Sequence, residues 1–418
     1  MINLAQIEEV AIDQLNVFKN KQLGIPRDID FEKYIKTKQI TVISGVRRCG
    51  KSTLMAQFAK KFDNFYYFNF DDERLIDFAV TDFENLMIVF KKMYEAKVIF
   101  LDEIQNIANW ERFARRIYEE GYKIFITGSN AKLLSSELAT HLTGRYFKIE
   151  LFPFSFREFL NYKKVDYKER STAAKAKILK NFDIFLKSGG FPEFIEYGDV
   201  EYLKRIYEDV LYKDLIARFK IREIKQFKHL SNFLLSNFTR EINYNKLKNI
   251  LDFKSVTSVK NYVDFIEQSY LIFELYKYDY SLKKQYVSNK KVYAIDNGLR
   301  NNTVFSFFDD NGKLLENLVF VELKRRGYDI FYFRNKNECD FLINEKSKIT
   351  QALQVTHMLN DNNIRREKLG LIEAMDEFQL KEGVILTAND EDIIRQDNLI
   401  IKIKPIWKWL LKKQRQSV

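Results

Sequence analysis

The sequence predicts a mixed α/β protein of several domains. Three short apolar runs rich in β-branched and aromatic residues, at 39–44, 98–101 and 123–126, have the length and composition of buried strands. Each run ends in small or charged polar residues, and the first leads directly into a segment with helical character at 53–60. At 418 residues the chain is also too long for one ordinary hydrophobic core. We therefore expect an α/β core followed by one or two further domains.

Composition narrows the class of protein. Hydrophobic residues make up 46% and charged residues 30% of the chain, which is the balance of a folded globular protein. A net charge of +11 favours anionic partners, nucleic acid first, although ordinary proteins can also be basic. The two cysteines, Cys49 and Cys339, exclude a disulfide framework. We find no secretory signal and no apolar run long enough for a membrane span, and we expect a cytoplasmic protein without a membrane partner.

The first strand runs into a glycine-framed loop with the spacing G-x-x-x-x-G-K-S. Between a strand and a helix, this spacing predicts a P-loop that binds ATP or GTP. Two glycines let the backbone wrap around phosphates, while the lysine reaches the β- and γ-phosphates and the serine hydroxyl ligates Mg²⁺. The residues expected to bind the nucleotide are Gly45, Val46, Arg47, Arg48, Cys49, Gly50, Lys51, Ser52 and Thr53.

The second strand ends in two carboxylates, Asp102 and Glu103. Beside a P-loop, Asp102 is expected to bind Mg²⁺ through water and Glu103 to polarise the attacking water. Taken alone, the pair could equally be the charged end of a buried strand. The P-loop favours the catalytic interpretation.

The third strand and the segment after it supply further candidates. Ser129 and Asn130 follow the strand and would lie near the γ-phosphate, between the two earlier strands. Arg145 could neutralise transition-state charge, in cis or from a neighbouring subunit, or it could be a surface arginine.

These runs together resemble a prokaryotic group of AAA+ ATPases. The resemblance rests on Gly45-Val-Arg-Arg-Cys-Gly-Lys-Ser-Thr, Leu101-Asp-Glu-Ile-Gln, Thr127-Gly-Ser-Asn, Leu142-Thr-Gly-Arg and the signature-like 150–160. It implies that Asp102 and Glu103 form the Walker B pair, that Ser129 or Asn130 is sensor 1, and that Arg145 is an arginine finger. It also implies an ATPase core over 1–160, a helical lid over 161–222, and a C-terminal domain of unknown function with a nuclease-like fold.

Residues 223–300 are predicted to form a winged helix. Three helices are expected, at 227–236, 243–251 and 256–268, with Ser255 capping the third. Two strands follow, at 270–276 and 291–295, joined by a wing that carries Lys283, Lys284 and Lys290. Residues 221–300 contain 14 basic and 8 acidic residues, and Lys254 and Lys260 are placed for phosphate contacts. DNA binding is the first interpretation; protein docking is the alternative.

Residues 301–418 are predicted to form a degenerate restriction-endonuclease-like domain. Glu316 is expected to open a helix and Asp340 to lie on a hairpin strand. An active member of this fold needs an acid and a lysine on the next strand, where this chain has Gln354-Val-Thr356. Lys368 is the candidate substitute. A domain kept for packing or DNA docking is favoured over a metal-dependent nuclease.

The leading hypothesis is therefore an AAA+ ATPase that couples ATP hydrolysis, with Mg²⁺, to DNA remodelling or translocation. Branched or junction DNA is the expected substrate, and a homo-oligomer in the form of a hexameric ring is expected if Arg145 acts in trans. The alternative is a nucleotide-gated switch in a signalling or defence complex.

Overall fold

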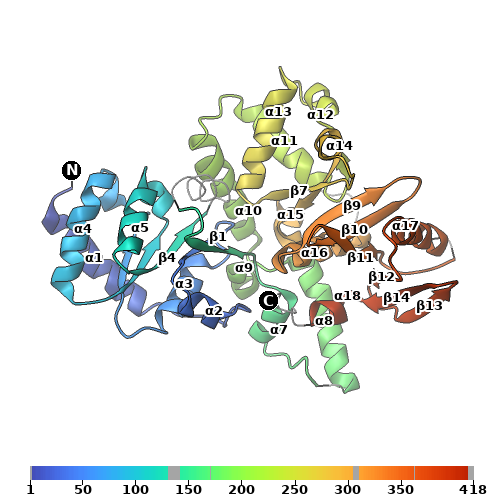
Figure 1. Cartoon of the computed structure of the whole chain (residues 1–418), viewed down its shortest axis with the longest axis horizontal. Coiled ribbons are helices and arrows are strands. Elements are labelled where there is room, and N and C mark those ends of the chain that lie inside the picture. Colours follow the sequence, from blue (N-terminus) through green and yellow to red (C-terminus); the bar gives the residue numbers. More distant parts are fainter. Residues whose placement is uncertain (1, 130–141, 170, 305–309, 362, 413–418) are drawn as a thin grey trace. The chain divides into compact units, whose positions relative to one another are not determined.

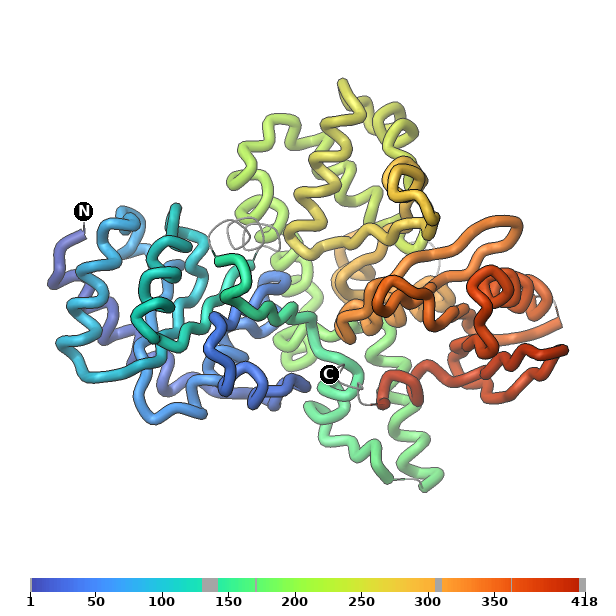
Figure 2. Tube along the Cα trace, in the orientation of Figure 1, coloured from blue at the N-terminus to red at the C-terminus, as the bar shows by residue number. Residues whose placement is uncertain are grey.

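The computed structural model describes residues 2–129, 142–169, 171–304, 310–361 and 363–412. The chain folds into two compact units, Met1–Phe152 and Pro153–Val418. In Figures 1 and 2 the first unit is coloured from blue to green and the second from green to red. Within the described residues, no helix is both long and apolar enough to span a bilayer.

The first unit is built on a five-stranded parallel sheet in the order β2-β3-β4-β1-β5. This confirms the predicted α/β class. Two of the strands, β2 and β5, lie outside the three predicted runs. The strands are β1 Ile40–Gly45, β2 Tyr66–Asn69, β3 Val98–Asp102, β4 Lys123–Gly128 and β5 Tyr146–Leu151.

Helices cover both faces of this sheet. They are α1 Leu4–Lys19, α2 Phe31–Lys36, α3 Lys51–Ala59, α4 Phe83–Met93 and α5 Trp110–Glu119, with short 3₁₀ turns at Glu73–Leu75, Val80–Asp82 and Ile104–Asn106. Because strand side chains alternate between faces, neighbouring residues of one strand enter different clusters. Phe100 and Phe125 stack with ring centroids 4.8 Å apart, and Phe58 of α3 lies 5.0 Å from Phe125.

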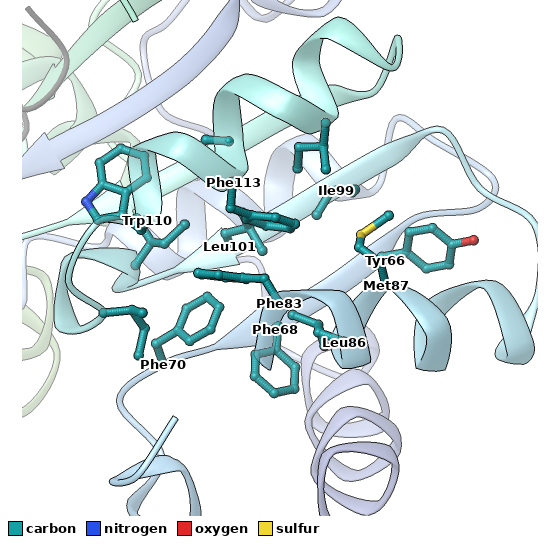
Figure 3. Close-up of a cluster of buried hydrophobic side chains, with 14 of the residues drawn as sticks. Tyr66, Phe68, Phe70, Phe83, Leu86, Met87, Ile99, Leu101, Trp110 and Phe113 are labelled. Carbon is teal, nitrogen blue, oxygen red and sulfur yellow. The ribbon is translucent and has the colours of Figure 1, made fainter. Parts of the chain in front are cut away.

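The opposite face packs against α1, α4 and α5. Its buried cluster includes Ile99 and Leu101 of β3 and the aromatic rings of β2 and α4 drawn in Figure 3. Phe83 and Phe113 stack there with centroids 4.0 Å apart, and Trp110 is fully buried. Burial on both faces explains why β1, β3 and β4 appear in the sequence as continuous apolar runs instead of alternating ones.

The second unit begins with helices and continues into a small three-stranded sheet of order β6-β8-β7. Its first part comprises α7 Phe156–Tyr162, α8 Thr172–Ser188, α9 Pro192–Tyr197, α10 Val200–Asp209, a π-helix at Val210–Ala217, α11 Ile224–Ser236, β6 Glu241–Ile242, α12 Tyr244–Ile250, α13 Val256–Gln268, β7 Ile272–Tyr276, α14 Leu282–Val287, β8 Lys290–Ala294 and α15 Asn297–Thr303. The Ser255 hydroxyl accepts a hydrogen bond from Ser258 N and caps α13.

The segment expected to form a wing differs from the prediction. It contains the helix α14, and Lys290 is the buried first residue of β8, with its Nζ donating to the carbonyls of Tyr286 and Ser288. Lys290 is therefore not placed for phosphate contacts. A four-carbon stem allows a lysine at a strand end to fold back on the preceding helix, which composition alone does not reveal.

The last part of the second unit is a six-stranded mixed sheet in the order β13-β14-β12-β11-β10-β9. Its elements are α16 Asn311–Arg325, β9 Asp329–Arg334, β10 Glu338–Glu345, β11 Lys348–Val355, α17 Ile364–Glu377, β12 Glu382–Thr387, β13 Asp392–Gln396, β14 Leu399–Pro405 and α18 Ile406–Leu410. The expectation that Glu316 opens a helix was wrong, because Asp310 caps α16 by accepting from Lys313 N. Glu316 lies inside the helix.

Candidate active site

The glycine-framed loop joins β1 to α3 as its spacing requires. A side chain at Gly45 would place a Cβ 2.1 Å from the carbonyl oxygen of Leu151, so only glycine fits beside β5. Gly50 has a φ of +98° and precedes α3 without a side-chain cap. Gly50 therefore supplies no side-chain acceptor to the first N–H groups of α3. They point, with the positive end of the helix dipole, at the space where an anion can bind.

Lys51 is the first residue of α3, and its side chain is only 5% exposed. Its Nζ donates to the carbonyl oxygens of Gly45 at 3.2 Å and Val46 at 3.3 Å and lies 3.8 Å from Oε1 of Glu103. These are long contacts for a buried ammonium. Phosphate oxygens could replace them without leaving the ammonium unpaired.

Arg27, in the segment before α2, holds the P-loop through hydrogen bonds to backbone carbonyls. Its guanidinium donates to the carbonyl oxygens of Cys49 at 2.9 Å and Phe152 at 2.7 Å. The Cys49 thiol points into the same interior, 3.4 Å from the Leu151 carbonyl, and burial raises its pKa. A buried, protonated thiol is a packing group and not a nucleophile. The sequence analysis missed Arg27, since nothing local ties it to a loop more than twenty residues away.

The two carboxylates lie at the carboxyl end of β3. Asp102 is buried, and its two oxygens accept hydrogen bonds from the hydroxyls of Thr127 and, at 3.2 Å, Tyr67. Glu103 N donates to the same Thr127 hydroxyl at 2.9 Å. One threonine on β4 therefore fixes both the first carboxylate and the backbone of the second. The sequence analysis missed both Thr127 and Tyr67.

The Glu103 backbone is in the left-handed region, with a φ of +51°. This conformation turns the chain out of the strand, and Gln105 Nε2 donates to one Glu103 oxygen while the other faces Lys51. Burial is the main cause that raises the pKa of Glu103; Lys51 opposes the shift and Asp102 adds to it. A carboxylate with a raised pKa is a better acceptor of a proton from water than an ordinary glutamate.

The structure describes most of the remaining predicted site residues. Ser129 is buried directly after β4, the strand between β1 and β3, whereas Asn130 lies outside the described residues. Arg47 is half-buried, and Arg48 is exposed with a φ of +65°. Ser52 and Thr53 are half-buried in the first turn of α3.

Arg145 does not approach the loop of its own subunit. Its carbonyl accepts a hydrogen bond from Ile40 N at the amino end of β1, and its guanidinium lies 3.8 Å from Glu119 Oε1. The P-loop is at the other end of β1, about 20 Å away for a six-residue strand. Any role for Arg145 in charge neutralisation therefore has to be in trans.

Oxygen ligands for Mg²⁺ are present but few. Each Asp102 oxygen keeps a second lone pair beyond its hydrogen bond, and Ser52 supplies a hydroxyl at the start of α3. Mg²⁺ keeps most of its water and takes one or two protein oxygens beside a nucleotide, so these two residues are the ones that could hold it.

Comparisons with known proteins agree with the P-loop geometry. Residues 37–160 match the family model described as an AAA domain, and residues 179–310 and 311–409 match two domains of unknown function, DUF8612 and DUF4143. The chain thus carries an AAA-type ATPase domain of the P-loop class, followed by domains without an assigned role.

Two curated relatives extend over most of the chain. An uncharacterized protein of Methanocaldococcus jannaschii is 40% identical over 97% of this chain and 95% of its own length. An uncharacterized protein of Haemophilus influenzae is 32% identical over 80% of this chain and 86% of its own length. The chain belongs to the same prokaryotic family of AAA-type ATPases with a C-terminal domain of unknown function.

Solved structures are less similar. The replication initiator DnaA bound to AMPPCP and single-stranded DNA is 16% identical over 57% of this chain and 84% of its own, with a TM-score of 0.29. AMPPCP-bound DnaA from Aquifex aeolicus is 13% identical over 56% and 85%, with a TM-score of 0.26. These scores are low, and the family assignment rests on the family models and the curated relatives.

Proposed function

We propose that this chain hydrolyses ATP at the site between β1 and β3. The observation that carries the proposal is the pairing of Lys51 at the start of α3 with Glu103, whose position Thr127 and Gln105 fix. One group is a buried cation suited to phosphate, and the other is a carboxylate suited to a water molecule. Bound ATP would supply the phosphoanhydride bond that is cleaved, and Mg²⁺ would neutralise negative charge on its phosphates.

Each residue then has a distinct task. The first-turn N–H groups of α3 and the Lys51 ammonium bind the phosphate oxygens. Ser52 and Asp102 would hold the metal. Glu103 orients the attacking water and accepts its proton, a task that its raised pKa favours. Ser129, buried directly after the central strand β4, would sense the terminal phosphate.

Two substitutions test this site. Lys51→Ala should abolish tight nucleotide binding, measured as the heat of Mg·ATP and Mg·GTP titration. Glu103→Gln should retain binding and lose turnover by about 100-fold, since only the proton acceptor is removed. Glu95→Gln, an exposed change of the same type in the same unit, is the matched control. Normal turnover in Glu103→Gln would remove Glu103 from the proposed role.

We also propose that ATP turnover is coupled to DNA through the region around α12 and α13. Lys246, Lys254 and Lys260 are exposed there, and the exposed positions of α13 include Thr257 and Asn261 but no acidic side chain. A polar, basic helix face of this kind suits phosphate contact. The buried Lys290 takes no part in this proposal.

The test is the ATP turnover rate with single-stranded, duplex and four-way-junction DNA at two salt concentrations. We expect stimulation that falls steeply with salt, and a salt slope reduced by about one in Lys260→Glu. Lys177→Glu, on an exposed part of α8, is the charge-matched control. Turnover indifferent to every DNA, with a stoichiometric protein partner in its place, would instead support a nucleotide-gated switch.

A further inference from the structure

Another buried ammonium lies in the C-terminal part of the chain. Lys291 of β8 is 3% exposed, and its Nζ lies 2.7 Å from Glu338 Oε1, 3.1 Å from Glu316 Oε1 and 3.1 Å from Asp340 Oδ1. Its Nζ donates hydrogen bonds to Glu316 and Asp340, and Glu338 completes a set of three ion pairs. Three carboxylates of its own chain therefore surround Lys291.

The three carboxylates come from two elements and are themselves held in place. Glu316 lies on α16 and accepts a hydrogen bond from the Tyr293 hydroxyl at 2.7 Å. Asp340 lies on β10, and its second oxygen accepts from Val355 N at 2.9 Å. Glu338, also on β10, is one-third exposed and forms the open side of the cluster. The ammonium thus ties β8 to α16 and β10.

Glu316 and Asp340 are the carboxylates at which the endonuclease-like interpretation places Mg²⁺, and this arrangement does not fit a metal. Mg²⁺ requires oxygens at about 2.0–2.1 Å, whereas these oxygens stand at ammonium distances. Within the described ranges no group of three such side chains is placed to hold a metal.

The next strand does not complete a metal site either. Gln354 is occupied, since its side chain accepts from Asp340 N and donates to Glu367. The Thr356 hydroxyl donates to the Met358 carbonyl. The lysine that contacts both Glu316 and Asp340 is Lys291 and not Lys368, the substitute expected from the sequence.

We propose that Lys291 is a built-in cation that takes the place of a divalent metal among Glu316, Glu338 and Asp340. The cluster of Lys291 and the three carboxylates is then complete without a metal and excludes one. An incoming ion would have to displace three ion pairs and bind beside a buried positive charge. The lysine lies in the segment matched by the first domain of unknown function and the carboxylates in the second. The centre therefore fastens these two segments to each other and does not cut nucleic acid.

Removal of the ammonium should turn the centre into a metal site. In Lys291→Ala, Glu316, Asp340 and the partly exposed Glu338 face an empty volume and repel one another, so the full-length, nucleotide-free variant should unfold several degrees lower in EDTA. Millimolar MnCl₂ should restore at least half of that loss. The double variant Lys291→Ala/Asp340→Asn should show no such recovery. The wild type is the control for effects of Mn²⁺ on other parts of the chain, including the P-loop. It should unfold at the same temperature in EDTA and in MnCl₂.

Three results would overturn the proposal. The first is a Lys291→Ala protein that folds but gains nothing from MnCl₂. The second is Mn²⁺ binding by the nucleotide-free wild type, measured by electron paramagnetic resonance, that disappears in Asp340→Asn. Mn²⁺-dependent DNA cleavage lost in Asp340→Asn and kept in Lys51→Ala would count in the same way, because Lys291 would then serve a metal-dependent nuclease. The resonance measurement needs only the wild type and Asp340→Asn, so it decides the question even if Lys291→Ala does not fold.

Discussion

The Thr127 hydroxyl contacts both carboxylate residues of the candidate site, Asp102 and Glu103. It donates to Asp102 and accepts from Glu103 N, and it is fully buried in β4. Thr127→Val keeps the shape of the side chain and removes both hydrogen bonds at once. The substitution therefore separates the contribution of the hydroxyl from that of packing.

The expected cost follows from the two bonds. A hydrogen bond to a charged group contributes about 1.5–3 kcal/mol, and a buried N–H left without an acceptor costs about 1–3 kcal/mol. Because the two share one oxygen and are not additive, we expect the free energy of unfolding to fall by about 2–4 kcal/mol. Turnover should fall by about 10- to 100-fold, since Glu103 loses its backbone anchor while Lys51 and nucleotide affinity are largely unaffected.

The assay is urea unfolding together with steady-state ATP turnover and Mg·ATP affinity. Thr127→Ser is the matched control, because it restores the hydroxyl and removes only a methyl group. It should recover most of the turnover. A Thr127→Val protein with turnover within twofold of wild type would refute the reasoning, and so would equal losses in the valine and serine variants.

Two further predictions concern other regions. Arg145→Ala should lose ATP turnover. Turnover should return when this variant is mixed with subunits that carry Lys51→Ala, because Arg145 can act only on a neighbouring subunit. An unchanged turnover rate in Arg145→Ala alone would exclude a role for Arg145. Burial raises the pKa of Glu267 to about 7, so wild-type stability should fall as pH rises from about 4.5 to 7. The amide oxygen of Glu267→Gln can still accept the hydrogen bond from Glu274 N. The free energy of unfolding of this variant, measured in urea, should equal that of the wild type at pH 4 and exceed it by up to about 3 kcal/mol at pH 8. Free energies of unfolding that differ by the same amount at both pH values would contradict this.

Local features of the chain were predictable from its sequence. The loop spacing that places Gly45, Gly50 and Lys51 is fixed by the geometry of a strand–turn–helix, so the sequence alone locates it. Asp102 and Glu103 follow a strand buried on both faces, whose continuous apolar run is a strong signal. The predicted cap of α13 at Ser255 is likewise a local hydrogen bond, and the structure contains it.

The groups that support these residues were not predictable in the same way. Thr127, Tyr67 and Arg27 act through pairings between strands or across the core, and no local spacing specifies which strand lies beside which. The strand β2 was missed because Tyr66–Asn69 is short and mainly aromatic. Lys291 was not predictable because the endonuclease-like motif places its lysine after the carboxylates, whereas Lys291 lies on β8, which precedes both carboxylates in the chain.

Lys51 and Lys291 are both buried, and we propose opposite roles for them because their partners differ. Both are at most 5% exposed, so each ammonium needs compensation that water cannot supply. Lys51 has two long contacts to carbonyl oxygens and a carboxylate at 3.8 Å, a set that leaves most of its charge available to a ligand. Lys291 has three carboxylates at 2.7–3.1 Å, and they raise its pKa further above its ordinary value despite burial. An under-compensated lysine at a helix N-terminus is suited to bind an anion, whereas an over-compensated one replaces a cation. The same substitution to alanine should therefore remove a ligand at position 51 and admit one at position 291.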